Sequence, residues 1–213
     1  LIFPKRPYVA ILGGAKVSDK IGVIEKLMDV VDAFIIGGAM AYTFLKAQGH
    51  FVGKSRVEDD KVKYAKELLA RIDARNKTIL LPVDHLVTKS ITDTVGASVK
   101  KEFGEGEMGV DIGPESLRNF SALIKEAGTI FWNGPMGVFE TPEFSKGTFN
   151  LAKVIAESKG TKIIGGGDSA AAAEQSGFAD KMTHISTGGG ASLEYLQGDK
   201  LPGLEVLRFK VRS

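Results

Sequence analysis

The sequence contains no cysteine among its 213 residues, which excludes disulfides, thiolate metal sites and cysteine nucleophiles. It also lacks any apolar run near the roughly 20 residues that a membrane-spanning helix needs, and its first residues show no signal-peptide pattern. Lysine and arginine number 28 against 26 aspartates and glutamates, so the net charge is only +2. Charge therefore gives no indication of nucleic-acid or membrane binding. We expect a cytoplasmic monomer that binds neither nucleic acid nor membrane.

What is present is an ordinary globular composition, 43% hydrophobic and 25% charged, with enough apolar residues for one domain with a substantial core. Short apolar runs alternate with helical patterns, and several runs are uninterrupted Val, Ile and Leu, as in strands buried on both faces. This alternation predicts a single α/β domain, a doubly wound and mostly parallel sheet with helices on both faces, Rossmann-like. The expected strands are Tyr8–Leu12, Ala33–Gly37, Thr78–Pro82, Met108–Ile112, Thr129–Trp132, Lys162–Gly165 and His184–Ser186. The expected helices are Val17–Val31, Ala39–Gln48, Glu58–Arg75, Pro114–Ala127, Glu143–Ser158, Ser169–Gln175 and Ala191–Leu196.

Three glycine-rich clusters follow predicted strands and precede predicted helices: Gly13-Gly14-Ala15-Lys16, Gly165-Gly166-Gly167-Asp168 and Gly188-Gly189-Gly190. Such a junction places free backbone N–H groups and the positive end of a helix dipole at one point, which suits an anion. Ligands of open α/β sheets bind at the carboxyl ends of the strands. Three clusters in one chain, two of them carrying Lys16 and Asp168, therefore indicate a site for phosphates and a divalent cation.

The charged residues of these clusters allow two interpretations each. Lys16 and Lys20 are four apart and are expected on one face at the start of a helix, either as solvated cations or as partners of a bound anion. Asp168 is either the N-cap of its helix or a carboxylate that holds Mg²⁺ beside phosphates.

Two other polar residues also allow a structural and a functional interpretation. Asn133 follows a predicted strand and can stabilise a turn or donate to a phosphate, and Glu140 is either a surface acid or an acceptor for ribose hydroxyls. His50, His85 and His184 have no metal-ligand spacing and are expected to be structural or solvated.

Two segments resemble the binding motifs of other protein classes. Gly49–Ser55 resembles a P-loop, but it follows a predicted helix and its glycine spacing is one residue short. Gly165-x-Gly167-x-x-Ala170 matches the dinucleotide-binding pattern after a strand, although the acid expected about 20 residues later is absent. An NAD-dependent oxidoreductase therefore stays an alternative.

Taken in order, several segments resemble the C-terminal, nucleotide-binding domain of phosphoglycerate kinase, and the likeness extends from about Arg6 to Leu207. Ala39 stands where many members of that family have a third glycine, so it would crowd one edge of the adenine slot. The segments that carry the resemblance are Ala10–Lys20, Ile35–Leu45, Met108–Pro114, Trp132–Glu140, Gly165–Ala170 and Thr187–Ser192.

The resemblance implies a role for each matching residue. Gly14, Ala15, Gly37, Gly38, Gly109, Val110 and Val138 would form the adenine slot, and Glu140 would bind the ribose. Lys16, Lys20 and Asn133 would contact phosphates, Asp168 would hold the Mg²⁺ of ADP or ATP, and Pro135, Gly166 and Ser169 complete the nucleotide-binding set. Lys16 and the amides of Gly167 and Gly190 would face the transferred phosphoryl group and act in catalysis.

The resemblance also implies a phosphotransferase activity, the glycolytic transfer of a phosphoryl group between 1,3-bisphosphoglycerate and ADP. The whole chain, residues 1–213, is then the nucleotide-binding domain, and the family's N-terminal domain, which binds 3-phosphoglycerate, is missing from it. We expect the chain alone to bind nucleotide with little or no turnover. A stand-alone, non-catalytic nucleotide-binding module is the alternative.

Overall fold

The computed structural model describes residues 4–186. Its main sheet has six strands in the order β3-β2-β1-β7-β8-β9, and every neighbouring pair is parallel. The chain order reverses between β1 and β7, the position where doubly wound sheets bind ligands. The predicted fold is confirmed as one α/β domain. The strands of this sheet are β1 (Tyr8–Leu12), β2 (Ala33–Ile36), β3 (Thr78–Leu80), β7 (Thr129–Asn133), β8 (Thr161–Gly165) and β9 (His184–Ser186).

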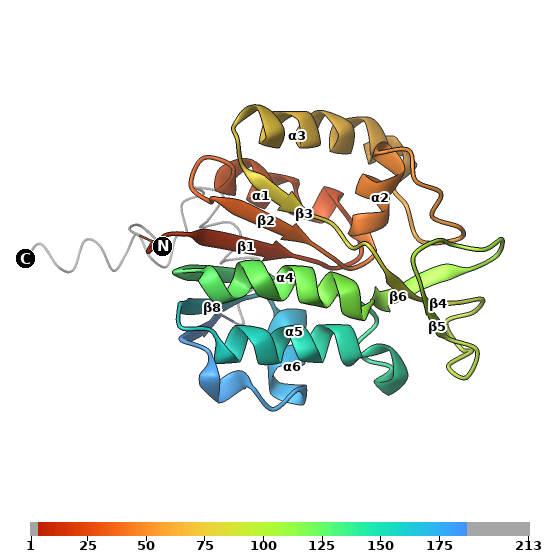
Figure 1. Cartoon of the computed structure of the whole chain (residues 1–213). Coiled ribbons are helices and arrows are strands. Elements are labelled where there is room, and N and C mark those ends of the chain that lie inside the picture. Colours follow the sequence, from red (N-terminus) through yellow and green to blue (C-terminus); the bar gives the residue numbers. More distant parts are fainter. Residues whose placement is uncertain (1–3, 187–213) are drawn as a thin grey trace, which may run out of the picture.

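Helices cover both faces of the sheet, as Figure 1 shows. One face packs against α1 (Ile21–Leu27), α2 (Met40–Ala47) and α3 (Val62–Ala74), and the other against α4 (Pro114–Glu126), α5 (Lys146–Glu157) and α6 (Gly167–Gln175). Strand β1 explains the sequence pattern, because Tyr8, Ala10 and Leu12 join the first core while Val9 and Ile11 join the second. A strand between two helical layers is apolar at every position.

A second, three-stranded sheet corrects the prediction. Strands β4 (His85–Thr88), β5 (Ser98–Lys100) and β6 (Met108–Ile112) pair antiparallel in the order β5-β4-β6. The strand at 108–112 was expected in the parallel sheet, and that placement is wrong. Strands β4 and β5 were not predicted. All three residues of β5 are exposed, so it carries no apolar signal, and periodicity does not tell which neighbour a strand pairs with.

The first predicted helix is also shorter than expected. Residues Ser18–Lys20 form a 3₁₀ turn and α1 begins only at Ile21. Glu58 accepts hydrogen bonds from the backbone N–H of Ser18 at 3.1 Å and from its hydroxyl at 2.5 Å, which fixes this turn against a distant loop. Lys16 lies ahead of the turn, so the shared helical face of Lys16 and Lys20 is wrong. The other described helices lie within their predicted ranges or extend them by two residues at most, and the helix expected at 191–196 lies outside the described residues.

Within residues 4–186, every helix is too short or too polar to cross a bilayer.

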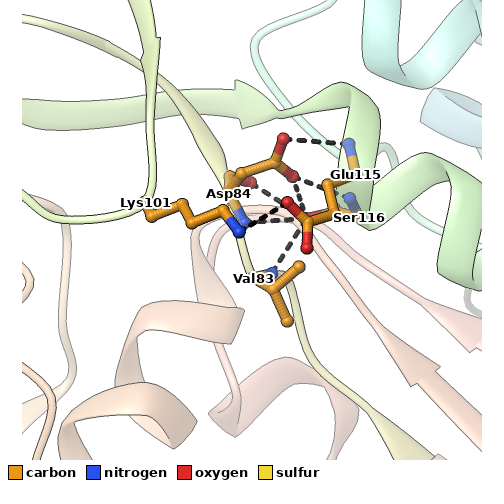
Figure 2. Close-up of polar contacts among 5 residues, drawn as sticks. All are labelled: Val83, Asp84, Lys101, Glu115 and Ser116. Atoms are coloured by element: carbon orange, nitrogen blue, oxygen red, sulfur yellow. Dashed lines mark hydrogen bonds and ion pairs between the residues drawn. The ribbon is translucent and has the colours of Figure 1, made fainter.

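The N-terminus of α4 is held by a residue from a distant loop (Figure 2). Its N-cap is Gly113, which has no side chain to offer. Asp84 supplies the missing carboxylate, which accepts from the backbone N–H groups of Glu115 at 2.9 Å and Ser116 at 2.7 Å and from the Ser116 hydroxyl at 2.6 Å. Burial alone would raise the pKa of Asp84, but these hydrogen bonds outweigh it and hold the pKa below its ordinary value.

Replacing Asp84 by alanine is therefore expected to lower the free energy of unfolding by about 2 kcal/mol, the cost of a lost cap and of buried donors left without an acceptor. Because the folded-state pKa is depressed, this contribution is present at neutral pH and is lost as the pH falls below about 4. Urea unfolding at pH 7 and pH 3 measures both effects. Asp93→Ala is the matched control, since Asp93 accepts a 2.9 Å bond from Gly96 on an exposed loop. Equal losses for the two variants at pH 7 would contradict the capping role.

Candidate nucleotide site

A cavity of about 240 Å³ opens near the carboxyl ends of β1, β2 and β7. Main-chain hydrogen bonds tie its loops together: Gly14 donates to Pro135 at 3.0 Å, Gly38 donates to Met136 at 3.0 Å, and Met40 donates to Gly14 at 3.0 Å. Nine residues that the sequence predicts for nucleotide binding line it: Gly14, Ala15, Gly38, Gly109, Val110, Pro135, Val138, Glu140 and Asp168.

The remaining predicted residues lie around this cavity or beyond the described chain. Gly37 precedes Gly38 and is buried, and Ser169 accepts a 2.5 Å hydrogen bond from the backbone N–H of Gly134. Gly166 is the N-cap of α6 and Gly167 its first residue. Lys16 is exposed in the loop after β1. Gly190, like the rest of its cluster, lies outside the described residues.

The cavity has three lining residues that the sequence did not assign to the site: Tyr42, Met136 and Gly137. Ala39 was expected to crowd one edge of the adenine slot, and it does line the cavity. Tyr42 and Met136 are almost fully buried and read in the sequence as ordinary core residues. The structure places Tyr42 against Gly109 and Met136 against Gly37, and the sequence does not predict either contact. The approach is close, because a Cβ atom at Gly109 would lie 1.8 Å from Oη of Tyr42.

The backbone at Gly38 allows the loops to meet closely. Its φ is +65°, and a Cβ atom there would lie 2.5 Å from the backbone nitrogen of Gly14 and 2.8 Å from the carbonyl oxygen of Pro135. Only glycine satisfies both the positive φ and the contact. The glycines after β1 and β2 thus serve close packing of the cavity wall as well as ligand access.

Lys20 and Asn133 form one polar group beside the cavity. The ammonium of Lys20 donates to Oδ1 of the buried Asn133, whose Nδ2 donates to the carbonyl of Gly165. Burial lowers the pKa of Lys20, while the charges of Asp19 and Asp168 act in the opposite direction. Asn133 therefore joins β7 to β8, and its carbonyl oxygen positions a lysine near Asp168.

Asp168 does not cap its helix. The N-cap of α6 is Gly166, and no side chain makes a capping hydrogen bond there, so the interpretation as an N-cap is wrong. The carboxylate is exposed, lines the cavity and makes no hydrogen bond or ion pair with another residue of the part that the structure describes. A hard oxygen donor left free beside an anion site fits Mg²⁺, which takes one or two carboxylates and completes its shell with phosphate oxygens and water. Residues 4–186 contain no group of three or more acidic, histidine or cysteine side chains that could hold a metal alone.

Asp111 is a buried acid beneath the cavity. It is 1% exposed, its Oδ2 accepts a 2.5 Å bond from the backbone N–H of Gly147 at the start of α5, and its Oδ1 has no partner among the described residues. A Cβ atom at Gly137, which lines the cavity, would lie 2.4 Å from that Oδ1. Burial raises the pKa of Asp111 to about 7, although the N–H groups of Gly147 and Ile112 partly oppose this.

This acid makes stability depend on pH. Its folded-state pKa is raised, so the neutral form favours folding, and stability falls as the pH rises from about 4 towards 7. In Asp111→Asn this dependence is removed. The stability of the variant relative to the unmodified chain should therefore rise by about 2–3 kcal/mol between pH 5 and pH 8. Guanidinium unfolding of both chains at the two pH values measures the change, and parallel pH dependence would show that Asp111 is ionised in the folded state.

Comparison with known proteins decides the family. The family model described as phosphoglycerate kinase matches residues 1–199. The chain belongs to the phosphoglycerate kinase family. A phosphoglycerate kinase of Bdellovibrio bacteriovorus is 74% identical over 211 residues, covering 98% of this chain and 53% of that protein. One from Clostridium perfringens is 58% identical over 208 residues, covering 97% of this chain and 52% of its own length.

Solved phosphoglycerate kinase structures share the fold. The structure from Coxiella burnetii superposes with a TM-score of 0.93 at 42% identity over 97% of this chain and 54% of that one. The structure from Pyrococcus horikoshii OT3 gives a TM-score of 0.82 at 34% identity, over 96% of this chain and 52% of that one. The chain thus spans about half the length of the phosphoglycerate kinases that it matches.

Proposed function

We propose that this chain is the C-terminal, nucleotide-binding half of a phosphoglycerate kinase and that it binds ADP or ATP with Mg²⁺. The observation that carries the proposal is the glycine-lined cavity at the reversal of strand order, with the free carboxylate of Asp168 at its margin. A cavity between loops at the carboxyl ends of parallel strands is where doubly wound sheets bind nucleotides.

The lining suggests how the nucleotide would lie. Gly109, Val110 and Val138 offer flat apolar walls for the adenine base, and the exposed carboxylate of Glu140 is placed to accept hydrogen bonds from ribose hydroxyls. The phosphates would then extend towards α6, whose first N–H groups, beginning with that of Gly167, have no partner within the helix. The N–H of Gly166 already donates to the carbonyl oxygen of Ser186 at 3.0 Å, so the amide of Gly167 is the one that we assign to the phosphates.

Cationic partners for the phosphates come from the loop after β1. Lys20 is held near Asp168 by Asn133, and the exposed Lys16 is free to reach a phosphate. Asp168 would hold the magnesium ion, which when bound neutralises phosphate charge. Lys20 lies close enough to Asp168 to interact with it electrostatically, so the lysine and the magnesium ion held by the carboxylate would act on the same phosphates.

The reaction we propose for the whole protein is phosphoryl transfer between 1,3-bisphosphoglycerate and ADP. Such transfer depends on positioning and charge stabilisation more than on covalent chemistry. Lys16 and the amide of Gly167 would face the transferred group, and the same role at Gly190 stays a prediction. The acceptor site and the exclusion of water would come from a second domain that closes over this one.

Replacing Asp168 by alanine tests the nucleotide assignment. A metal ligand acts only through its metal, so Asp168→Ala should weaken Mg²⁺–ADP binding at least about tenfold, or about 1.4 kcal/mol, and leave metal-free ADP binding nearly unchanged. Calorimetric titration of ADP with Mg²⁺ and with a chelator measures both. Asp180→Ala, an exposed acid that does not line the cavity, is the control and should change neither. Equal weakening of both forms in Asp168→Ala would contradict the metal role.

A further inference from the structure

The loop that carries Lys16 is fastened by a segment from elsewhere in the chain, residues 53–58 between α2 and α3. We call residues 14–18 the lysine loop. The side chain of Lys16 is exposed and makes no hydrogen bond or ion pair with another residue of the described part of the chain. A free lysine side chain has many rotamers, and ordering it on a phosphate costs binding free energy. Its usefulness therefore depends on how firmly the backbone beneath it is held.

The start of the lysine loop is tied to helix α2. The backbone N–H of Met40, the first residue of α2, donates to the carbonyl oxygen of Gly14 at 3.0 Å. Further along the loop, Val17 is fully buried in the same core cluster as Met40. Ala15 and Lys16, which lie between these two points, are exposed. The loop therefore presents Lys16 to solvent from a backbone that is anchored on both sides.

The end of the lysine loop is held by Glu58. Its carboxylate accepts hydrogen bonds from the backbone N–H of Ser18 at 3.1 Å and from the Ser18 hydroxyl at 2.5 Å. Desolvation alone would raise the pKa of Glu58, but these bonds and one from the backbone N–H of Val17 outweigh it and hold the pKa below its ordinary value. Glu58 is therefore ionised at neutral pH and occupies amides that a bound anion could otherwise use. What the lysine loop offers to a phosphate is then the lysine side chain.

Glu58 is itself fixed by two further contacts of its segment. Its backbone N–H donates to Oγ1 of the buried Thr43, further along α2 from Met40, at 3.1 Å. At the other end of the segment, the hydroxyl of the buried Ser55 accepts a 2.9 Å hydrogen bond from the backbone N–H of Gly109, a residue of the proposed adenine slot. Both ends of the lysine loop are therefore tied to α2, and the segment that holds its second end is also tied to the nucleotide cavity.

We propose that Glu58 is a positioning residue for phosphoryl transfer, which holds the lysine loop so that Lys16 meets the terminal phosphate of ATP. The inference rests on the proposed function, in which Lys16 faces the transferred group. Because ADP lacks that phosphate, the effect of Glu58 should appear in ATP binding and hardly in ADP binding. Charge alone predicts a change of the opposite sign, since removing a carboxylate next to the lysine loop would favour an anion there.

Calorimetric titration of the 213-residue chain with Mg²⁺–ATP and with Mg²⁺–ADP tests the proposal. Glu58→Ala should weaken Mg²⁺–ATP binding about threefold or more, the size typical of an exposed ion pair, and change Mg²⁺–ADP binding less than about twofold. Glu58→Gln keeps an acceptor oxygen for Ser18 and should bind ATP as tightly as the unmodified chain, or more tightly. Glu67→Ala is the matched control and should change neither affinity, because Glu67 is an exposed acid of α3 that pairs only with the exposed Lys63 among the described residues.

A double-mutant cycle shows whether Glu58 acts through Lys16. In the Lys16→Ala background, Glu58→Ala should cause no further loss of ATP affinity, because the group that it positions is gone. Hydrogen exchange of the Ser18 amide measures the contact without nucleotide and should be several times faster in Glu58→Ala. Ser18→Ala removes one of the two Ser18 bonds from the other side. It should lower ATP affinity selectively as well, which keeps the proposal testable if Glu58→Ala does not fold.

The proposal fails if Glu58→Ala binds Mg²⁺–ATP as tightly as the unmodified chain or more tightly, or if it weakens ATP and ADP equally. It also fails if the loss is the same with and without Lys16, which is the result expected of a merely structural role, or if the exchange rate of Ser18 does not change. Mg²⁺–ADP binding by the unmodified chain is measured first, since its absence would refute the proposed function itself. Normal Mg²⁺–ADP binding together with unchanged ATP affinity in Glu58→Ala would refute the role of Glu58 alone.

Discussion

The 213-residue chain alone is expected to phosphorylate 3-phosphoglycerate from ATP at a rate at least about 10³-fold below that of a two-domain relative. The reason follows from the proposed division of labour. A missing arginine of the finger type costs about 10³–10⁵ in rate, and lost positioning of the second substrate forfeits about 7–11 kcal/mol. Lys16, the helix amides and Mg²⁺ cannot offset losses of that size. A coupled assay on highly purified chain measures the rate.

Lys16→Ala separates true activity from contamination. In the isolated chain this variant should change ADP affinity only modestly, since Lys16 is exposed and Lys20 is the lysine held near Asp168. In a two-domain relative, the matching substitution should reduce turnover severely. Turnover by the isolated chain that scales with its concentration and disappears in Lys16→Ala would contradict the proposed need for a second domain.

Gly38→Ala is expected to destabilise the chain by about 3 kcal/mol and to weaken ADP binding at least tenfold. A left-handed conformation costs a non-glycine residue about 1–2 kcal/mol, and overpacking adds about 1–3 kcal/mol. The new methyl group would lie 2.5 Å from two backbone atoms of Gly14, and those atoms cannot yield without moving the cavity wall. Urea unfolding and ADP titration measure the two effects.

Gly177→Ala is the matched control for that substitution. Gly177 also has a positive φ, +78°, but a Cβ atom there meets nothing within 4 Å. It should therefore lose only the conformational term, about 1 kcal/mol, and bind ADP normally. If the two variants are equally stable, the contact between the loops after β1 and β2 is not what requires glycine at position 38.

The parallel sheet could be predicted because a strand that is buried on both faces is apolar at every position. Strands β1, β2 and β7 are buried at every residue, so each reads as an apolar run. The three-stranded sheet could not be predicted in this way, since β5 is exposed throughout and has no apolar run. The start of α1 was misplaced because Glu58, 40 residues from Ser18 along the chain, fixes the 3₁₀ turn there, and helical periodicity does not register a contact of that kind.

Some residues of the candidate site could likewise be predicted from the sequence, and others could not. The glycines and Asp168 could be predicted to lie together, because junctions that follow parallel strands meet at the carboxyl edge of the sheet. Tyr42 and Met136 could not, since an apolar side chain in a helix or loop gives no sign of facing a cavity. Asp111 lies within the segment Met108–Pro114, where nothing in the sequence marks it as buried. Its burial follows from the close packing of Gly137 and Gly147 against its carboxylate.

The most direct test of the central claim, that the glycine-lined cavity is the nucleotide site, is NMR of the chain labelled with ¹⁵N-glycine. Addition of Mg²⁺–ADP should shift the amide signals of Gly14, Gly38, Gly109 and Gly137 most strongly, because all four line the cavity. Gly160 and Gly177, which do not line the cavity, should stay unchanged. Largest shifts at a glycine outside the cavity, such as Gly49, or no shifts among the four lining glycines at saturating ADP, would contradict the claim.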